Sequence, residues 1–329
     1  MNAHSKVANL SSRDIPDLSL TETSALIASG QATPLEVTEA VLSRIDAVED
    51  KLTAFIALTR DRALEKAEIA TKERAAGLDR GPLHGIPFAL KDLCETDFAP
   101  TSAGLALLKD NQTGRNATVT ERLEQAGCIT IGKLGMTEGA YSGHNDKMAV
   151  PKNPWNPKLW PGSSSSGSGV SVAAGMAFGS TGSDTGGSIR FPSGACGITG
   201  MKGTWGRVSR HGVFALADSL DHVGPMARTA EDCAAIMTAI AGADANDPTA
   251  LLAPVPDYLA ACAGPVRGMR IGVDRAAVID ESAPETAAVI EEAIAVYESL
   301  GAEIVPVSFP WPSDAVDQWT VLCAIEVAL

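Results

Sequence analysis

The chain has 329 residues, of which 45% are hydrophobic and 20% are charged. This composition excludes a disordered protein and leaves room for one large domain or two ordinary ones. The 26 basic and 40 acidic side chains give a formal charge of −14. Because that charge repels phosphate groups, we expect no direct nucleic-acid binding and no attraction to anionic membranes.

Targeting and redox features indicate a cytoplasmic protein. The longest nearly apolar run, VSVAAGMAFG at 170–179, is about half of the ~20 residues that a membrane span needs. The first residues lack the basic start and apolar core of a secretory signal, so residues 1–19 are predicted to form a loose tail. The six cysteines have no CxxC spacing, which favours reduced, buried thiols over a disulfide or zinc framework.

The first helix signal is the segment Thr33–Glu36. It combines an N-cap threonine, a proline at the first helical position and a capping-box glutamate. An apolar stripe at helical spacing follows, formed by Val41, Ile45 and Val48. The pattern predicts a helix over residues 34–49.

Strand and helix signals then alternate along the chain. TVTERLEQAG at 118–127 indicates a helix that ends at Gly127, and CITIGKL at 128–134 is typical of a buried strand. The same order returns at 269–307, with the strand MRIGVD, the helix PETAAVIEEAIAVYESLG and the strand AEIVPV. Such alternation predicts an α/β fold with a largely parallel or mixed sheet covered by helices.

The stretch PGSSSSGSG at 161–169 has the composition of a flexible linker. However, SGVSVAAGMA at 168–177 is typical of a closely packed helix, and FGSTGSDT at 178–185 alternates as a short strand does. A linker should lie between two units, whereas this stretch lies in the most apolar region of the chain. We therefore predict a loop inside a folded unit.

Two other kinds of site are not supported. Gly162 and Gly167 have the spacing of a phosphate-binding GxxxxG loop, but Ser168 stands where that loop needs a lysine. The sequence has no GxSxG, as an esterase nucleophile elbow requires, and no GxGxxG that opens a helix, as a dinucleotide site requires.

Three segments carry a resemblance to a known family. They are HGIPFALKD at 84–92, PGSSSSGS at 161–168 and GSDTGGSIRFPSGACGITGMKGTWGRVS at 182–209. Together they resemble the amidase signature family, which hydrolyses or transfers carboxamides with a serine, a second serine in a cis peptide and a lysine. The resemblance implies an amidase signature domain over residues 20–329, with a mixed central sheet covered by helices on both faces.

The resemblance also implies a catalytic triad, in which Ser188 is the nucleophile, Ser164 the cis-serine and Lys91 the base. A serine hydroxyl is a weak nucleophile at neutral pH, so a base must take its proton. A lysine can do so only if burial lowers its pKa from ~10.4, and Lys91 follows the apolar PFAL as the end of a buried strand would. Ser164 would relay the proton and later return it to the leaving amine.

Further residues match family positions around the triad. Backbone N–H groups of a glycine-containing loop are expected to form an oxyanion hole, and the loop consists of Thr185, Gly186, Gly187 and Ser188. Asp184 and Arg190 match positions that brace this loop, and Ser165 matches a hydroxyl beside the cis-serine. The resemblance requires no metal, no cofactor and no histidine, so His84 and His144 are expected to be structural or pocket residues.

The chain departs from the family pattern in two places. Ser163 stands where the family usually has glycine, so the cis peptide would join two serines. Family members generally continue past Leu329, so we expect the C-terminal part of the family fold to be absent. The final helix, TVLCAIEVAL, is then expected to expose an apolar stripe formed by Val321, Leu322, Ile325 and Leu329.

Three functions are consistent with these residues. We favour an amidase that splits a small carboxamide, acting alone or as a homo-oligomer; HNDKMAVPKNPWNP at 144–157 resembles general amidases. The alternative is the A subunit of the aspartyl/glutamyl-tRNA amidotransferase, a glutaminase with B and C subunits as partners. GRVSRHGVFALADSLDHVGPMARTAEDC at 206–233 resembles that branch. The third is a truncated, non-catalytic relic.

Overall fold

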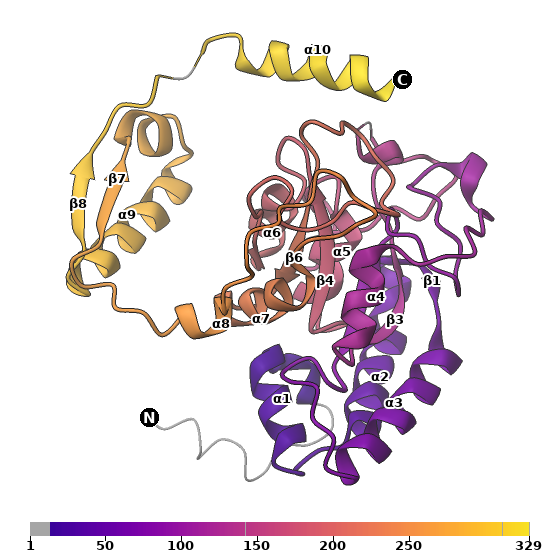
Figure 1. Ribbon diagram of the computed structural model, residues 1–329. Helices are drawn as coiled ribbons and strands as arrows, with labels where there is room; N and C mark the ends of the chain where they lie inside the picture. Colours follow the sequence, from indigo (N-terminus) through magenta and orange to yellow (C-terminus); the bar gives the residue numbers. More distant parts are fainter. Residues whose placement is uncertain (1–13, 142, 311, 329) are drawn as a thin grey trace. The chain divides into compact units, whose positions relative to one another are not determined.

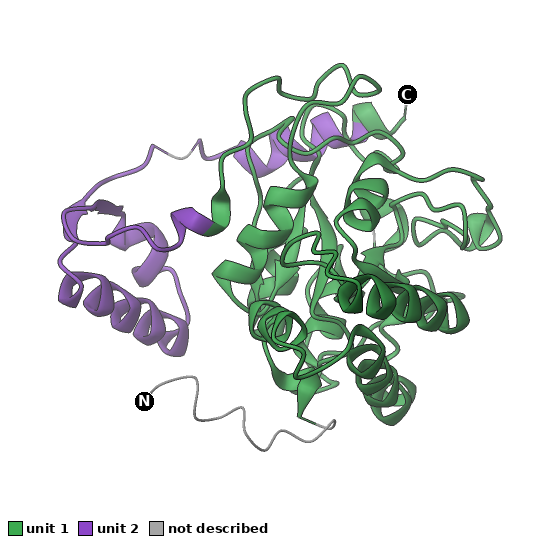
Figure 2. Cartoon of the chain, turned by 60° about the horizontal axis from the view of Figure 1, so that its bottom comes forward, with its two compact units in different colours: residues 1–259, 325–329 green, residues 260–324 purple. Residues whose placement is uncertain are grey.

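The computed structural model describes residues 14–141, 143–310 and 312–328 (Figure 1). The chain forms two compact units (Figure 2). The first consists of residues 1–259 together with 325–329, and the second of residues 260–324. A single amidase signature domain over 20–329 stays a prediction.

Helices and strands alternate through most of the chain. The α-helices are α1 (Leu20–Ala28), α2 (Pro34–Leu52), α3 (Arg60–Ala75), α4 (Thr118–Gln125), α5 (Ser166–Ala173), α6 (Arg190–Cys196), α7 (Ala230–Ile240), α8 (Tyr258–Ala261), α9 (Pro284–Ser299) and α10 (Ala315–Val327). The strands are β1 (Phe55–Leu58), β2 (Pro87–Lys91), β3 (Ile129–Leu134), β4 (Gly179–Asp184), β5 (Thr199–Gly200), β6 (His222–Ala227), β7 (Arg270–Val273) and β8 (Glu303–Pro306).

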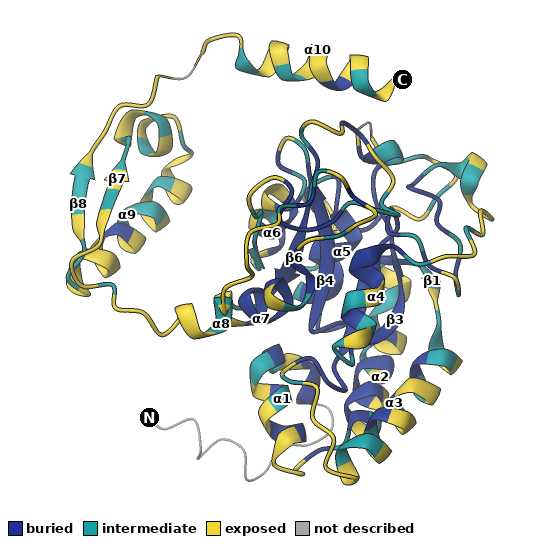
Figure 3. Cartoon of the chain, viewed as in Figure 1, coloured by how far each residue is buried: buried dark blue, intermediate teal, exposed yellow. Residues whose placement is uncertain are grey.

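The first unit is built around a six-stranded mixed sheet. Its strand order is β1-β3-β2-β4-β6-β5. The central strand β2 pairs in parallel with β3 and with β4. On one side β1 pairs antiparallel with β3, and on the other β6 pairs antiparallel with β4. The short strand β5 pairs antiparallel with β6 at the edge. The strands β2, β3 and β4 are buried along their whole length (Figure 3). This topology confirms the predicted α/β class with a mixed sheet.

Helices cover both faces of this sheet. Successive residues of a strand point to opposite faces, and the glycines of β4 show what lies on each side. A Cβ atom on Gly179 would contact Ile236 of α7, whereas one on Gly182 would contact Ser165 and Ile189, which precede α5 and α6. The expectation of helices on both faces is therefore confirmed.

The helix predicted over 34–49 is α2, and its start follows the capping chemistry of the sequence. The Thr33 side chain accepts a hydrogen bond from the Glu36 backbone N–H, while the Glu36 carboxylate accepts one from the Thr33 N–H at 2.8 Å. The helix runs to Leu52 and ends where Thr53 adopts a left-handed conformation with φ 50°. Such a conformation often terminates a helix.

Part of the segment predicted as a loose tail is folded. Residues 1–13 lie outside the described residues. Ile15 and Pro16 begin a short 3-10 turn and are buried, and the Ser19 side chain caps α1 by accepting from the Glu22 N–H at 3.1 Å. The apolar pair and the capping serine explain why the chain is ordered from this point.

The cysteines agree only in part with the prediction of buried, reduced thiols. All six cysteines are free thiols, and five are buried as predicted, whereas Cys262 is exposed. The residues on either side of it, Ala261 and Ala263, are exposed as well. Among the described helices, none combines the length and apolar character needed to cross a membrane.

The second unit has the predicted strand-helix-strand order. The strands β7 and β8 pair in parallel, and α9 connects them. Of the described residues in 260–324, only Ile294 and Cys323 are buried, so this unit has almost no core. Exposed apolar side chains of the unit include Val289, Val296, Phe309 and Val316.

We expect the chain to bind a hydrophobic dye such as anilinonaphthalene sulfonate, because exposed apolar patches bind such probes. Val289 and Val296 lie two turns apart on α9 and are 65% and 56% exposed. Changing both to lysine should lower the dye fluorescence by about half. Thr286→Lys adds a charge to the same helix without removing an apolar group, so it is the control. Unchanged fluorescence in the double variant would contradict the assignment of the patch.

Candidate active site

Lys91 lies at the C-terminal end of β2, beside the end of the parallel strand β4. Its side chain is fully buried. The Nζ atom donates hydrogen bonds to Ser164 Oγ and to Ser183 Oγ, both at 2.7 Å. The C-terminal ends of neighbouring parallel strands meet at one edge of a sheet, which explains why residues so distant in sequence converge here.

The surroundings of Lys91 favour its neutral form. Burial lowers the pKa of Lys91 to about 7, against the opposing influence of Cys94, Asp221 and Asp184. A lysine with a pKa of about 7 is about half neutral at pH 7, and the neutral half can accept a proton as a general base must. Lys91 therefore has the lowered pKa that a lysine needs to act as a base.

The serine-rich stretch is a packed loop that leads into α5. The peptide bond between Ser163 and Ser164 is cis, as the resemblance implied. A Cβ atom on Gly162 would lie 2.2 Å from the Cα of Pro192, so the loop lies directly against α6. The Ser164 carbonyl accepts a hydrogen bond from the Thr137 N–H at 3.2 Å. These contacts confirm that the stretch is a loop inside a folded unit.

Ser188 lies in the turn between β4 and α6 and is half-buried. The backbone N–H of Ser165 donates to the Ser188 carbonyl at 3.4 Å, so the two serine loops are neighbours. Among the described residues no hydrogen bond joins the Ser164 and Ser188 side chains. Such bonds often form only when substrate is bound, and the role of Ser188 as nucleophile stays a prediction.

The loop before Ser188 depends on glycine. Gly187 has a φ of 142°, a conformation that side chains disfavour. A Cβ atom there would also lie 2.2 Å from the Phe191 ring. Only glycine therefore fits this position. That the N–H groups of this loop form an oxyanion hole stays a prediction.

Asp184 and Arg190 form the predicted brace across this loop. Two hydrogen bonds join the guanidinium to the carboxylate, at 2.9 and 3.0 Å, and the Ile189 N–H donates to the same carboxylate at 3.1 Å. Burial raises the pKa of Asp184, but these hydrogen bonds outweigh it and hold the pKa below its usual value. The carboxylate therefore stays charged and fixes both ends of the turn.

Ser165 joins the two loops to β4, since its Oγ lies 3.3 Å from both the backbone N and the carbonyl oxygen of Ser183. Ser183 itself was not among the predicted site residues. The sequence offered one signal for it: Ser183 lies two residues before Thr185, near the end of the predicted strand at 178–185. Asp221, which bonds the Thr185 side chain, was also missed.

Among the described residues, neither His84 nor His144 forms a hydrogen bond with Ser164 or Ser188. The His84 ring lies 2.9 Å from Glu73 and accepts from the Arg80 N–H at 3.3 Å, beside a cavity of about 410 Å³. His144 Nε2 lies 3.0 Å from Ser166 Oγ. Burial lowers the pKa of both rings. These contacts favour structural roles.

Comparison with known proteins identifies the family. The family model described as Amidase matches residues 36–328, which is most of the chain. The chain belongs to the amidase family. Solved structures of family members have the same fold: the peptide amidase of Stenotrophomonas maltophilia superposes with a TM-score of 0.86 at 35% identity, covering 94% of this chain and 66% of that one.

Two groups of relatives are similar in sequence. AmiD of Mycobacterium tuberculosis, a candidate amidase, is 47% identical over 289 residues, which are 87% of this chain and 60% of that protein. The A subunit of the glutamyl-tRNA(Gln) amidotransferase of Chloroflexus aurantiacus is 42% identical over 317 residues, which are 96% of this chain and 65% of that protein. The chain thus spans less than two thirds of the length of these amidase relatives.

Proposed function

We propose that this amidase-family chain hydrolyses a carboxamide C–N bond through an acyl-enzyme on Ser188. The observation that carries the proposal is the buried contact between Lys91 Nζ and Ser164 Oγ at 2.7 Å. A lysine without a carboxylate partner in a dry site can be neutral, and its hydroxyl neighbour lies on the loop beside Ser188.

The residues suggest a proton path for each step. Ser164 takes the proton of Ser188 as Ser188 Oγ attacks the amide carbon, and passes its own proton to Lys91. The oxyanion of the tetrahedral intermediate accepts hydrogen bonds from the loop that precedes Ser188. Reversal of the relay protonates the leaving amine, the C–N bond breaks, and the acyl group stays on Ser188. Water, deprotonated by the same path, then releases the carboxylate.

The second candidate is the glutaminase component of a tRNA amidotransferase, which would act with B and C subunits. The 42% identity to the Chloroflexus aurantiacus protein favours it, whereas the 47% identity to AmiD and the peptide amidase fold favour a small-amide hydrolase. We place the hydrolase first. A non-catalytic relic would bind amides without turnover. A cytoplasmic location and a homo-oligomeric state stay predictions.

Labelling with a serine-directed fluorophosphonate tests the proposed nucleophile. The reagent should add one phosphonyl group to Ser188, located by peptide mass mapping. Ser188→Ala should remove the label entirely, whereas Ser193→Ala should retain it, because the Ser193 hydroxyl only bonds the Ile189 carbonyl on the same segment. A label on another serine, or none on the folded chain, would refute the acyl-enzyme proposal.

Measurement of ammonia release separates the two candidate functions. A hydrolase should act on small carboxamides or peptide C-terminal amides, whereas the glutaminase function requires preference for glutamine and stimulation by the B and C subunits. Glutamine turnover that depends on those partners would reverse our order of the two candidates.

A further inference from the structure

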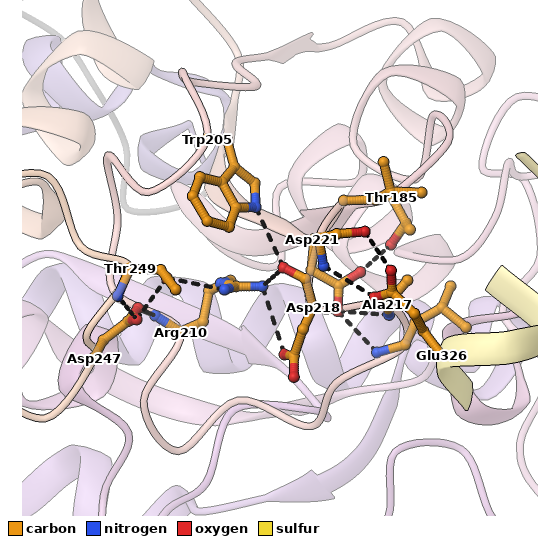
Figure 4. Close-up of polar contacts among 12 residues, drawn as sticks. Thr185, Trp205, Arg210, Ala217, Asp218, Asp221, Asp247, Thr249 and Glu326 are labelled. Carbon is orange, nitrogen blue, oxygen red and sulfur yellow. Dashed lines mark hydrogen bonds and ion pairs between the residues drawn. The ribbon is translucent and has the colours of Figure 1, made fainter. Parts of the chain in front are cut away.

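Asp221 is a buried carboxylate that contacts the oxyanion loop from outside. It is only 8% exposed. The Thr185 hydroxyl donates to Asp221 Oδ1 at 2.5 Å, and the backbone N–H groups of Leu216 and Ala217 donate to Oδ2 at 2.8 and 3.1 Å. Figure 4 shows the carboxylate between the Thr185 side chain and the turn that contains Ala217.

The turn that holds Asp221 is itself anchored. The Asp218 carbonyl accepts from the Trp205 indole N–H at 3.3 Å and from the Arg210 guanidinium (Figure 4). The Arg210 guanidinium lies 5.2 Å from the centre of the Trp205 ring, within the range of a cation–π contact. The carboxylate therefore projects from a fixed turn toward Thr185.

Thr185 begins the predicted oxyanion hole. Backbone N–H groups stabilise an oxyanion only when their direction is fixed before the reaction. The Asp184–Arg190 brace secures one side of the turn. On the other side, the Thr185 side chain is held by Asp221, so the two acidic residues fix the loop from both directions.

Asp221 also acts electrostatically on Lys91. The ionisable groups whose charges act on Lys91 are Cys94, Asp221 and Asp184, and all three oppose the lowering of its pKa by burial. Burial raises the pKa of the Cys94 thiol, so that thiol is neutral near pH 7. Burial also raises the pKa of Asp221, although its three hydrogen bonds oppose this. The ionised forms of Asp221 and Asp184 are then the charges that favour protonated Lys91.

We propose that Asp221 is a positioning residue that orients the oxyanion loop through the Thr185 hydroxyl. The inference rests on the proposed acyl-enzyme function and extends it to a residue beyond the triad. It predicts that loss of Asp221 slows attack by Ser188 while reagent binding is little changed. An orienting group affects the tetrahedral state more than the bound ground state.

The test is the rate of fluorophosphonate labelling of the full chain as a function of reagent concentration and pH. Asp221→Asn cannot accept from the hydroxyl and both N–H groups at once, so the maximal labelling rate should fall at least ~10-fold. Reagent affinity should change less than ~3-fold. The acid limb of the pH profile should move to lower pH, because a lost negative charge lowers the pKa of Lys91.

Thr185→Val separates orientation from charge. It removes the hydroxyl but keeps the Asp221 carboxylate, so the labelling rate should fall while the acid limb stays in place. It also replaces Asp221→Asn as the test if that variant does not fold.

Asp232 supplies a matched control outside this network. It is 0% exposed and accepts hydrogen bonds from the backbone N–H and the hydroxyl of Thr21, at 2.9 and 3.0 Å. Its charge is not among those that act on Lys91. Asp232→Asn should leave both the labelling rate and the acid limb unchanged, although the variant is less stable.

The outcomes are distinct from those for the proposed function. Absence of label on wild-type Ser188 refutes the acyl-enzyme itself. If wild type is labelled, equal rates in Asp221→Asn and Thr185→Val would overturn the positioning role. So would an equal loss of rate in Asp232→Asn, because the effect would then be that of any buried carboxylate in this unit.

Discussion

Replacement of Lys91 by methionine is expected to make the chain more stable and at least ~10²-fold slower in labelling at Ser188, because the positioned base is lost. The stabilisation follows from burial. Lys91 is fully buried without a carboxylate in hydrogen-bond contact, and its pKa falls from the usual 10.5 to about 7. A shift of this size costs about 4 kcal/mol at pH 7, which an apolar side chain of similar length avoids. Loss of the hydrogen bonds to Ser164 and Ser183 offsets part of this gain, so we expect unfolding at pH 7 to require about 2 kcal/mol more.

The sign of the pH dependence can be worked out. Between pH 7 and 10.5 the unfolded chain binds the Lys91 proton more tightly than the folded chain does, so the stability of wild type rises with pH. The lysine contributes about 1 to 2 kcal/mol to this rise between pH 7 and 8.5. Buried thiols such as Cys196 and Cys233, with pKa values of about 12, oppose it only above pH ~9.

Urea unfolding of wild type and Lys91→Met at pH 7 and 8.5 measures this difference, and comparison of the two proteins cancels the other titrating groups. Lys133→Met is the matched control. Lys133 is equally buried, but its Nζ lies 3.1 Å from the buried Asp92 carboxylate. Its loss leaves that carboxylate unpaired and should destabilise by roughly 3 to 5 kcal/mol. Destabilisation by both substitutions would contradict the neutral-base assignment of Lys91.

Replacement of Gly187 by alanine is expected to lower the labelling rate of Ser188 by at least ~10²-fold, the scale of losing an oxyanion-hole donor. Alanine is strained at a φ of 142°, and its methyl group would collide with the Phe191 ring, 2.2 Å from the Cβ position. The loop must then move, and the N–H groups before Ser188 lose their direction.

Gly194→Ala is the control for this experiment. Gly194 lies in α6 on the same segment, and a Cβ atom there meets nothing within 4 Å, so the alanine should be neutral or slightly stabilising. Labelling kinetics and thermal unfolding of both variants distinguish local strain from general sensitivity of the segment. A Gly187→Ala variant labelled as fast as wild type would show that this loop does not line the oxyanion.

Local patterns predicted the elements well because their causes are local. The threonine, proline and glutamate at 33–36 contain the capping bonds that start α2, and the apolar run before Lys91 is buried along all of β2. The family motifs singled out Lys91 and Ser164, and the two side chains lie 2.7 Å apart. Which of these segments meet in space depends on the sheet, because the sheet places β2 beside β4.

The contacts that were missed depend on distant partners. Ser183 meets Lys91 only because β4 lies beside β2, and Asp221 reaches Thr185 from a turn before the antiparallel strand β6. A lone serine or aspartate has no periodicity that marks such a meeting. The sparse core of residues 260–324 also could not be predicted, since its sequence has the same strand and helix signals as the buried sheet.

The most direct test of the neutral-lysine relay is the pH dependence of fluorophosphonate labelling at Ser188 in wild type and Lys91→Met. In wild type the rate should rise with pH and be half-maximal near pH 7, because Lys91, with a pKa of about 7, must lose its proton before it can accept one. In Lys91→Met this acid limb should disappear, leaving a slow rate without a step near pH 7. An acid limb at the same pH in both proteins would contradict the account, because another group would then be the base.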